Sequence, residues 1–134
     1  MSADTNVATI KSVYDAFGRG DVRTILNALS DDVNWATEAA STAVPWYGVR
    51  SGKSEVSAFF EQFGSTMEVD DFTPLAFAAN ETDVMTVVRM KAHHRANGRT
   101  MDMQMHHWFA FRDGLIAHHR ATEDTAQVEL LFRA

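Results

Sequence analysis

The spacing of apolar residues changes about halfway along the chain from roughly 3.6 residues to 2, and this change restricts the fold more than any other feature. Before it, helical spacing places apolar residues on three stripes: Val7, Ile10, Val13, Tyr14 and Phe17; Val22, Ile25, Leu26 and Leu29; Val56, Phe59, Phe60, Phe63 and Met67. Asp21 is a suitable N-cap for the second stripe. After the change, strands are predicted at about 69–79, 84–95, 99–111 and 115–123.

Helices first and an antiparallel meander afterwards predict an α+β fold, in which three helices pack on one face of a curved antiparallel sheet. Between the second and third helices, "DDVNWATEA" predicts a short strand and "ASTAVPWYGVRSG" a loop. The tail "TAQVELLF" is expected to form one or two helical turns or to pair with a partner. No repeat or linker divides the 134 residues, so we expect one domain over 1–134.

Composition excludes several classes of protein. The net charge of −6 argues against nucleic acid or an anionic membrane as the main partner. No apolar run approaches the roughly 18 residues of a membrane span, and "MSADTNVATIK" lacks the features of a secretory signal. The absence of cysteine excludes disulfides and thiolate chemistry. We therefore expect a cytoplasmic protein.

The segment "TMDMQMHHWFAF", from Thr100 to Phe111, alternates between apolar and polar residues, and its two histidines fall on opposite faces. Asn97-Gly98 predicts a two-residue hairpin that pairs Met90 with Met105 and Val88 with His107. This register turns His107 inward and His106 outward. The inward face is apolar and comprises Val88, Met90, Ala92, Met101, Met103, Met105 and Phe109.

The last turn, "FRDGL", leaves two registers open. A three-residue loop, which we favour, places His107 opposite His119, with Cβ atoms about 4.5–5.5 Å apart. A two-residue loop would pair Trp108 with His119 and turn His118 inward instead. His94 also points inward, but it lies roughly 20 Å from His107 along the strand, too far to share a metal ion. Glu123 lies about 13 Å along the strand from His119, which is also too far for the two side chains to share a metal ion.

Three stretches carry a family resemblance: "VYDAFGRGDVRTILNALSDDVNW", "GVRSGKSEVSAFF" and "NGRTMDMQMHHWFAFRDGLIAHHRATED". They resemble the SnoaL-like branch of the nuclear transport factor 2-like superfamily, over nearly the whole chain. The resemblance implies a cone-shaped α+β barrel with an apolar pocket between sheet and helices, and commonly a dimer through the outer face of the sheet. Relatives include ketosteroid isomerases, polyketide cyclases, limonene epoxide hydrolases and dehydratases.

The resemblance also allows each activity to be compared with the residues present. His107 falls where ketosteroid isomerases keep a protonated Asp that donates to the oxyanion. Their Tyr position falls on Val13, beside Tyr14, and their base position falls near Thr37, beside Glu38, so steroid isomerisation is not expected. The Arg and two Asp of the epoxide hydrolases fall on residues that cannot replace them: Val88, Met90 and Ala121. Polyketide cyclases use a pocket carboxylate as base, for which Glu123 is the inward candidate.

We therefore expect a pocket that binds a small, largely apolar molecule with a carbonyl or hydroxyl group. The candidate catalytic residues are His107, His119 and Glu123, with His107 as acid or base in a cofactor-free isomerase, cyclase or dehydratase. The expected pocket-lining residues are Tyr14, Phe17, Trp35, Trp46, Tyr47, Phe59, Phe63, Met90, Met103, Met105 and Phe109. We expect no metal and no cofactor. The alternative is a non-catalytic binding or scaffold module of the same fold.

The outward face of the predicted sheet is unusually basic for an acidic protein. It carries Arg89, Lys91, His93, Arg95, His106, Trp108, His118 and Arg120. A solvated surface would explain such a face, but an isolated tryptophan is costly to leave exposed on a sheet. We therefore predict a homodimer through this face, with Trp108 near the centre of the interface.

Overall fold

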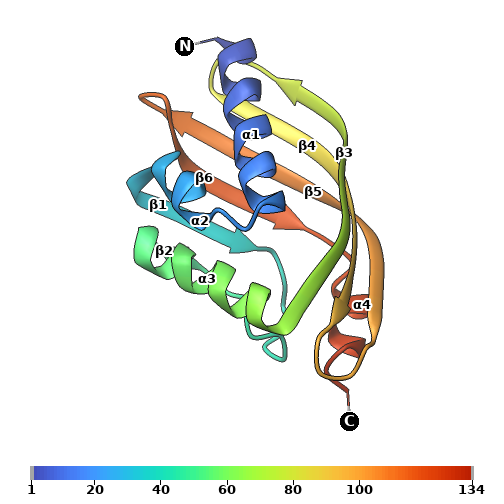
Figure 1. Cartoon of the computed structure of the whole chain (residues 1–134). Helices are drawn as coiled ribbons and strands as arrows, with labels where there is room; N and C mark the ends of the chain where they lie inside the picture. Colours follow the sequence, from blue (N-terminus) through green and yellow to red (C-terminus); the bar gives the residue numbers. More distant parts are fainter. Residues whose placement is uncertain (1, 134) are drawn as a thin grey trace.

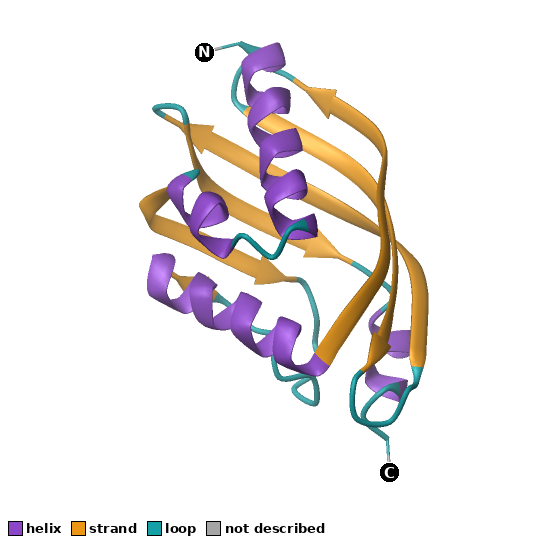
Figure 2. Cartoon of the chain, viewed as in Figure 1, coloured by secondary structure: helices purple, strands orange, loops and turns teal. Residues whose placement is uncertain are grey.

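A computed structural model describes residues 2–133 as a curved six-stranded sheet with helices α1, α2 and α3 across one face (Figures 1 and 2). The elements are α1 (Ala3–Gly18), α2 (Val22–Asn27), β1 (Leu29–Thr37), β2 (Arg50–Ser51), α3 (Lys53–Thr66), β3 (Met67–Ala79), β4 (Asp83–His94), β5 (Thr100–Arg112), β6 (Leu115–Thr122) and α4 (Thr125–Leu130). The strand order is β2-β1-β6-β5-β4-β3. The predicted α+β class is confirmed.

The helices begin where the sequence provides caps. The Ser2 side chain accepts a hydrogen bond from the Thr5 amide, and Asp21 accepts one from the Thr24 amide, as predicted for the second helix. The apolar stripe of α1 buries Ile10, Val13 and Tyr14 against the sheet. The face of the sheet under the helices therefore forms the core of the domain.

One strand pairing departs from the antiparallel sheet that we expected. Strand β1 pairs in parallel with β6, whereas the pairs β1–β2, β3–β4, β4–β5 and β5–β6 are antiparallel. No hairpin connects β1 to β6, so turn chemistry does not dictate their relative direction. The pairing brings Trp35 of β1 opposite His119 of β6.

The β4–β5 hairpin is longer than the two-residue turn that Asn97-Gly98 suggests. Residues 95–99 form the loop, closed by a hydrogen bond of 2.7 Å from the His94 amide to the Arg99 carbonyl. Met90 therefore pairs with Met103, and Thr86, not Val88, pairs with His107. The predicted pairs were wrong by two residues, but the predicted faces are confirmed because side chains alternate with a period of two.

The β5–β6 turn also differs from the loop that we favoured. Asp113 and Gly114 both have positive φ, 52° and 81°, which is the two-residue type I′ geometry. Beyond the turn, Phe111 pairs with Ile116 but the next pair is Ala110 with His118, so Ala117 is an extra residue that forms a β-bulge. This bulge reverses which side chains of the rest of β6 point inward. As a result, His119 points inward opposite Phe109, and His107 pairs with Ala121.

The C-terminal tail forms the helix α4, which lies beside the end of the β4–β5 hairpin (Figure 1). The Asn97 side chain donates to the Leu131 carbonyl over 3.0 Å, and Gln127 bonds the backbone of Asp102. These contacts fix the tail to the domain. Within residues 2–133, no helix is long and apolar enough to cross a membrane.

Candidate functional site

A cavity of about 80 Å³ lies between the sheet and the helices, and we call it the inner cavity. Its wall is mostly aliphatic and aromatic, with a few polar groups. It is lined by Val13, Tyr14, Phe17, Ile25, Trp35, Thr37, Trp46, Phe59, Phe60, Phe63, Phe72, Met90, Met101, Met105, His107, Phe109, His119, Ala121 and Glu123. An apolar wall with few polar groups is the usual composition of a small-molecule site.

His107 is held by a short chain of hydrogen bonds that starts in β4 and passes through α1. The Tyr14 hydroxyl lies 2.6 Å from the Thr86 hydroxyl and 2.7 Å from Nδ1 of His107. Burial, together with the neighbouring charge of His106, lowers the pKa of His107 from 6.5 to about 4. Burial also raises the pKa of Tyr14. Both side chains are therefore neutral at pH 7.

His119 is more deeply buried, with 4% of its surface exposed, and is enclosed by aromatic rings. Its ring stacks on that of Phe109 with centroids 4.4 Å apart, and the centroid of the Trp35 ring lies 4.0 Å from that of His119. Its Nδ1 donates to the Trp108 carbonyl over 3.1 Å. Burial, and then the neighbouring His107, hold the pKa of His119 well below 6.5.

Glu123 brings a carboxyl group to the wall of the same cavity. The Tyr47 hydroxyl donates to Oε2 of Glu123 over 2.8 Å. Burial raises the pKa of this carboxyl group above 4.5, although the hydrogen bond from Tyr47 opposes the change. The loop before β2 thus contributes to the site through a hydrogen bond.

The structure places most of the expected site residues on the cavity wall. His107, His119 and Glu123 all line it, as do nine of the eleven aromatic and methionine positions, which leaves Tyr47 and Met103 as the exceptions. Tyr47 reaches the site only through its hydrogen bond to the lining residue Glu123. Met103 is core, 5% exposed and paired with Met90. Met101, whose cross-strand partner is Ala92, borders the cavity instead.

Sequence reasoning missed several residues that shape the site. Thr86 holds the Tyr14 hydroxyl, and Phe60, Phe72 and Thr37 line the wall. Thr86 carried a detectable signal: it is a polar residue on the inward face of a strand whose neighbours on that face, Val84 and Val88, are apolar. Phe72 belongs to β3, whose bulges obscure the alternation that would have placed it inward.

Two imidazoles could serve as metal ligands, but a third group does not join them. Within residues 2–133, no cluster of three His, Asp or Glu side chains is arranged to hold a metal ion. The titratable side chains on the cavity wall, His107, His119 and Glu123, are of types that can transfer protons and form hydrogen bonds.

The opposite face of the sheet holds an open groove of about 470 Å³, which we call the outer groove. It is lined by Glu38, Ala76, Phe77, Ala78, Met85, Thr86, Val87, His106, His107, Trp108, Arg120 and Thr122. Met85 and Trp108 are cross-strand partners there, 56% and 38% exposed. The indole nitrogen of Trp108 donates to Asp83 over 2.7 Å.

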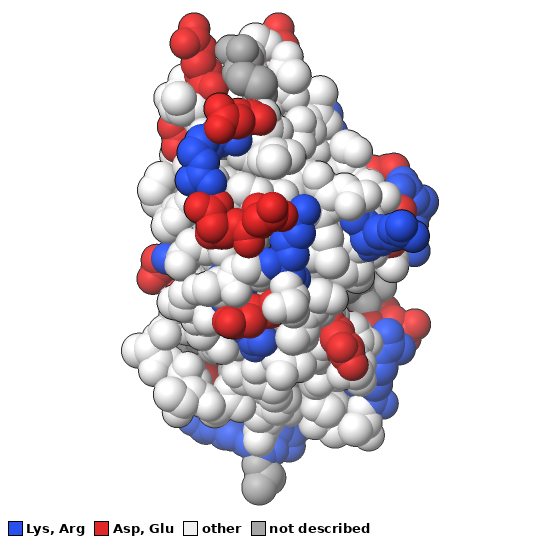
Figure 3. Space-filling view, turned by 90° about the vertical axis from the view of Figure 1, so that its left-hand side faces the viewer, with Lys and Arg blue, Asp and Glu red and all other residues white. Residues whose placement is uncertain are grey.

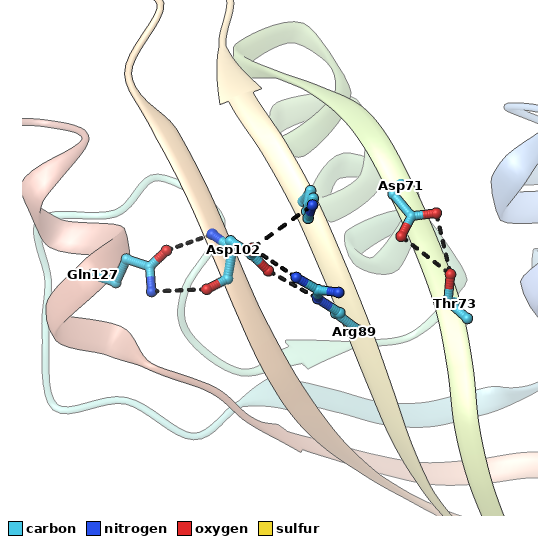
Figure 4. Close-up of polar contacts among 6 residues, drawn as sticks. Asp71, Thr73, Arg89, Asp102 and Gln127 are labelled. Carbon is cyan, nitrogen blue, oxygen red and sulfur yellow. Dashed lines mark hydrogen bonds and ion pairs between the residues drawn. The ribbon is translucent and has the colours of Figure 1, made fainter.

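The outward face is less basic than its list of Lys, Arg and His suggests, because acidic partners lie among them. Arg89 forms two hydrogen bonds with Asp102, at 3.1 and 3.0 Å, and Gln127 of α4 bonds the Asp102 backbone (Figure 4). Arg120 pairs with Glu38 over 3.3 Å. On the side of the molecule in Figure 3, acidic and basic side chains are also interspersed.

Comparison with known proteins gives one family match and several structural neighbours. The profile of the SnoaL-like domain family matches residues 10–119. A nuclear transport factor 2-like protein of unknown function from Burkholderia pseudomallei is 24% identical, with 97% of this chain and 98% of that chain covered and a TM-score of 0.86. No curated protein sequence matches this chain.

Two further neighbours have names that mention chemistry. A crystal structure of TerC co-crystallised with polyporic acid is 20% identical, covering 97% of this chain and 99% of that chain, with a TM-score of 0.84. A polyketide cyclase candidate from Xanthomonas campestris pv. campestris is 18% identical, covering 98% of each chain, with a TM-score of 0.81. At such identities the similarity shows a shared fold alone.

Proposed function

The chain belongs to the SnoaL-like domain family, and from that premise we propose that its inner cavity binds a small, largely apolar molecule with a carbonyl or hydroxyl group. We further propose that His107 and His119 move a proton on that molecule, in a cofactor-free isomerisation, cyclisation or dehydration. The family match confirms the resemblance that the sequence predicted. The ligand and the reaction are our proposal.

The observation that carries the proposal is a pair of uncharged imidazoles in an apolar cavity. Their ring centroids lie 5.3 Å apart, and burial lowers both pKa values. Shifted pKa values at titratable groups in a cavity are a feature of functional sites. A neutral imidazole can accept a proton or donate a hydrogen bond, which are the two operations needed beside a carbonyl group.

The size of the cavity limits the ligand. A closed apolar cavity of about 150 Å³ binds benzene, and the inner cavity is about 80 Å³. A ring-sized ligand must therefore displace side chains, and the unbranched Met90, Met101 and Met105 are well suited to that adjustment. We expect a ligand of one or two rings, not a steroid.

A second candidate function is a binding module without catalysis. It is favoured by the engagement of His107 with Tyr14 and of His119 with a backbone carbonyl, since such contacts also suit side chains that only set the polarity of a pocket. The two candidates differ in one measurable respect. A catalyst exchanges protons on its ligand, whereas a binding module does not.

We also propose that the protein is a homodimer through the outer groove. The exposed Met85 and Trp108 supply an apolar centre, and the ion pairs Arg89–Asp102 and Arg120–Glu38 lie on the same face as polar groups around it. An apolar core with a charged rim is typical of protein–protein interfaces.

The experiment begins with native mass spectrometry of the purified protein, to identify any co-purified molecule. A panel of small cyclic diketones and hydroxyquinones is then incubated with the protein in D₂O, and hydrogen exchange next to the carbonyl is followed by NMR. We expect the double variant His107→Asn/His119→Asn, which removes both imidazoles, to slow catalysed exchange by roughly 10²–10⁴-fold. The control is His106→Asn, which changes the adjacent, outward-facing histidine. Binding without any exchange by the wild-type protein would favour the binding module.

A further inference from the structure

The hydrogen bond of His119 determines which of its two nitrogens carries the proton. Nδ1 lies 3.1 Å from the Trp108 carbonyl oxygen, and a carbonyl oxygen only accepts hydrogen bonds. Nδ1 must therefore carry the hydrogen of the neutral ring. Nε2 is then left with a lone pair, because a neutral imidazole has one N–H group.

The hydroxyl hydrogens of Thr86 and Tyr14 determine in the same way which nitrogen of His107 carries its hydrogen. The Tyr14 hydroxyl has one hydrogen and two neighbours, the Thr86 hydroxyl and Nδ1 of His107. If Tyr14 donated to Thr86, the hydroxyl hydrogen of the buried Thr86 would have no acceptor among the described residues. If Thr86 donates to Tyr14 and Tyr14 donates to His107, both hydroxyl hydrogens are satisfied. The second arrangement also joins the more acidic hydroxyl to the more basic acceptor.

The remaining nitrogen of each ring is open. Within residues 2–133, no side chain or backbone group forms a hydrogen bond with Nε2 of either histidine. Among the described residues, the buried side-chain polar atoms that lack a partner are Asn6 Oδ1 and Ser30 Oγ. The two Nε2 atoms are not among them, so each retains some accessible surface. Both histidines line the inner cavity, where a ligand can contact them; His107 also borders the outer groove.

From these three observations, we propose that the two histidines present opposite tautomers to the cavity. His119 offers the Nε2 lone pair and acts as the base, whereas His107 offers an Nε2–H group and acts as a hydrogen-bond donor. Tyr14 and the Trp108 carbonyl are the positioning groups that set these states. This assignment of roles rests on the proposed function. It predicts a ligand with an acidic hydrogen on a carbon next to a carbonyl group.

The resulting proton transfer is balanced without a cofactor. The C–H bond next to the carbonyl breaks, Nε2 of His119 takes the proton, and the electron pair moves onto the carbonyl oxygen as an enolate. Nε2–H of His107 donates a hydrogen bond to that oxygen, as a neutral imidazole can. In a ligand whose C–H bond lies between the carbonyl and a C=C bond, the enolate is conjugated with that C=C bond; His119 returns its proton to the far carbon of the C=C bond, and the double bond moves next to the carbonyl. The net result is an isomerisation, and the enzyme regains its starting state.

The first test measures the tautomers directly, by ¹⁵N NMR of the full, labelled chain at neutral pH. Each ring is identified by its through-space contacts, His119 to Phe109 and His107 to Tyr14. We expect the proton of His119 on Nδ1 and that of His107 on Nε2. Tyr14→Phe should move the proton of His107 to Nδ1 in part of the molecules, whereas Tyr47→Phe, a matched change at the other buried tyrosine, should not. The same tautomer at both wild-type rings would overturn the assignment.

The second test separates this assignment from the proposed function. A glutamine side chain retains an N–H donor but cannot accept a proton at neutral pH. In the D₂O assay, His119→Gln should lose roughly 10²–10⁴-fold of exchange, whereas His107→Gln should lose about tenfold or less. Equal losses, with both variants folded by circular dichroism, would overturn the assignment of roles. If the wild type catalyses no exchange, the proposed function fails, and the NMR result alone then decides between the tautomers.

Discussion

The imidazole of His107 stands at 83° to that of His119, with ring centroids 5.3 Å apart. The two residues are not direct cross-strand partners, because His107 pairs with Ala121 and His119 with Phe109. They are diagonal neighbours, a relationship that still allows rings to touch. The bulge at Ala117 produces it, since without that extra residue His119 would face outward.

The half-buried imidazole of His107 and the buried imidazole of His119 should make the stability of the fold depend on pH. An unfolded histidine takes up a proton near pH 6.5, whereas His107 in the fold does so only near pH 4. Between these values the unfolded chain binds more protons, so the free energy of unfolding should fall as the pH is lowered from 6.5 to 4. For His107 the loss is at most about 3 kcal/mol. Urea unfolding of wild type and His107→Asn should show a smaller loss in the variant; parallel curves would mean that His107 is protonated freely in the fold.

Glu123 should have the opposite effect on the pH dependence. Burial raises the pKa of its carboxyl group in the fold, so the ionised form is disfavoured there relative to the unfolded chain. Wild type should therefore lose stability as the pH rises from 4.5 through the folded pKa. Glu123→Gln retains an acceptor for the Tyr47 hydroxyl and removes the charge. Its urea midpoint should exceed that of wild type at pH 7 and match it at pH 4, and a lower midpoint at pH 7 would show that the charge stabilises the fold.

The Tyr14 hydroxyl should stabilise the fold as well as position His107. Tyr14→Phe leaves the buried Thr86 hydroxyl and Nδ1 of His107 without their partner, which should cost about 1–3 kcal/mol in the free energy of unfolding. Thr86→Val should cost less in the Tyr14→Phe background than in wild type, because the partner is already absent. Chemical denaturation of the four proteins in this cycle measures the coupling, and additive losses would argue against a connected chain of hydrogen bonds.

The outer groove should be covered in solution by a second copy of the chain. We expect a dimer at micromolar concentration by light scattering, with on the order of 800 Å² buried per partner. Met85→Glu introduces a charge beside Trp108 and should give monomers, since Met85 is exposed and its replacement leaves the core intact. Val49→Glu is the matched control, because Val49 is similarly exposed, at 59%, and does not line the groove. A monomeric wild type would exclude this interface.

Local sequence patterns were sufficient for the elements and for the faces of the strands. The period of two placed His107 inward and His106 outward even though the hairpin register was wrong by two residues, because such an error leaves every face unchanged. Asp21 was recognised as a cap because its side chain acts only on the adjacent turn. In each case the deciding interaction joins residues that are close in the sequence.

The sequence by itself thus determined the α+β class, the inward position of His107 and most of the residues on the cavity wall. Only the tertiary structure decided that a bulge at Ala117, and not a three-residue loop, turns His119 inward, that β1 runs parallel to β6, and that Tyr14 lies between Thr86 and His107. Each of these features depends on contact between segments that are far apart along the chain. A hydrogen bond from Tyr14 to His107 joins a helix to a strand that begins more than 80 residues later, and no local pattern encodes such a meeting; packing of the whole sheet against α1 creates it.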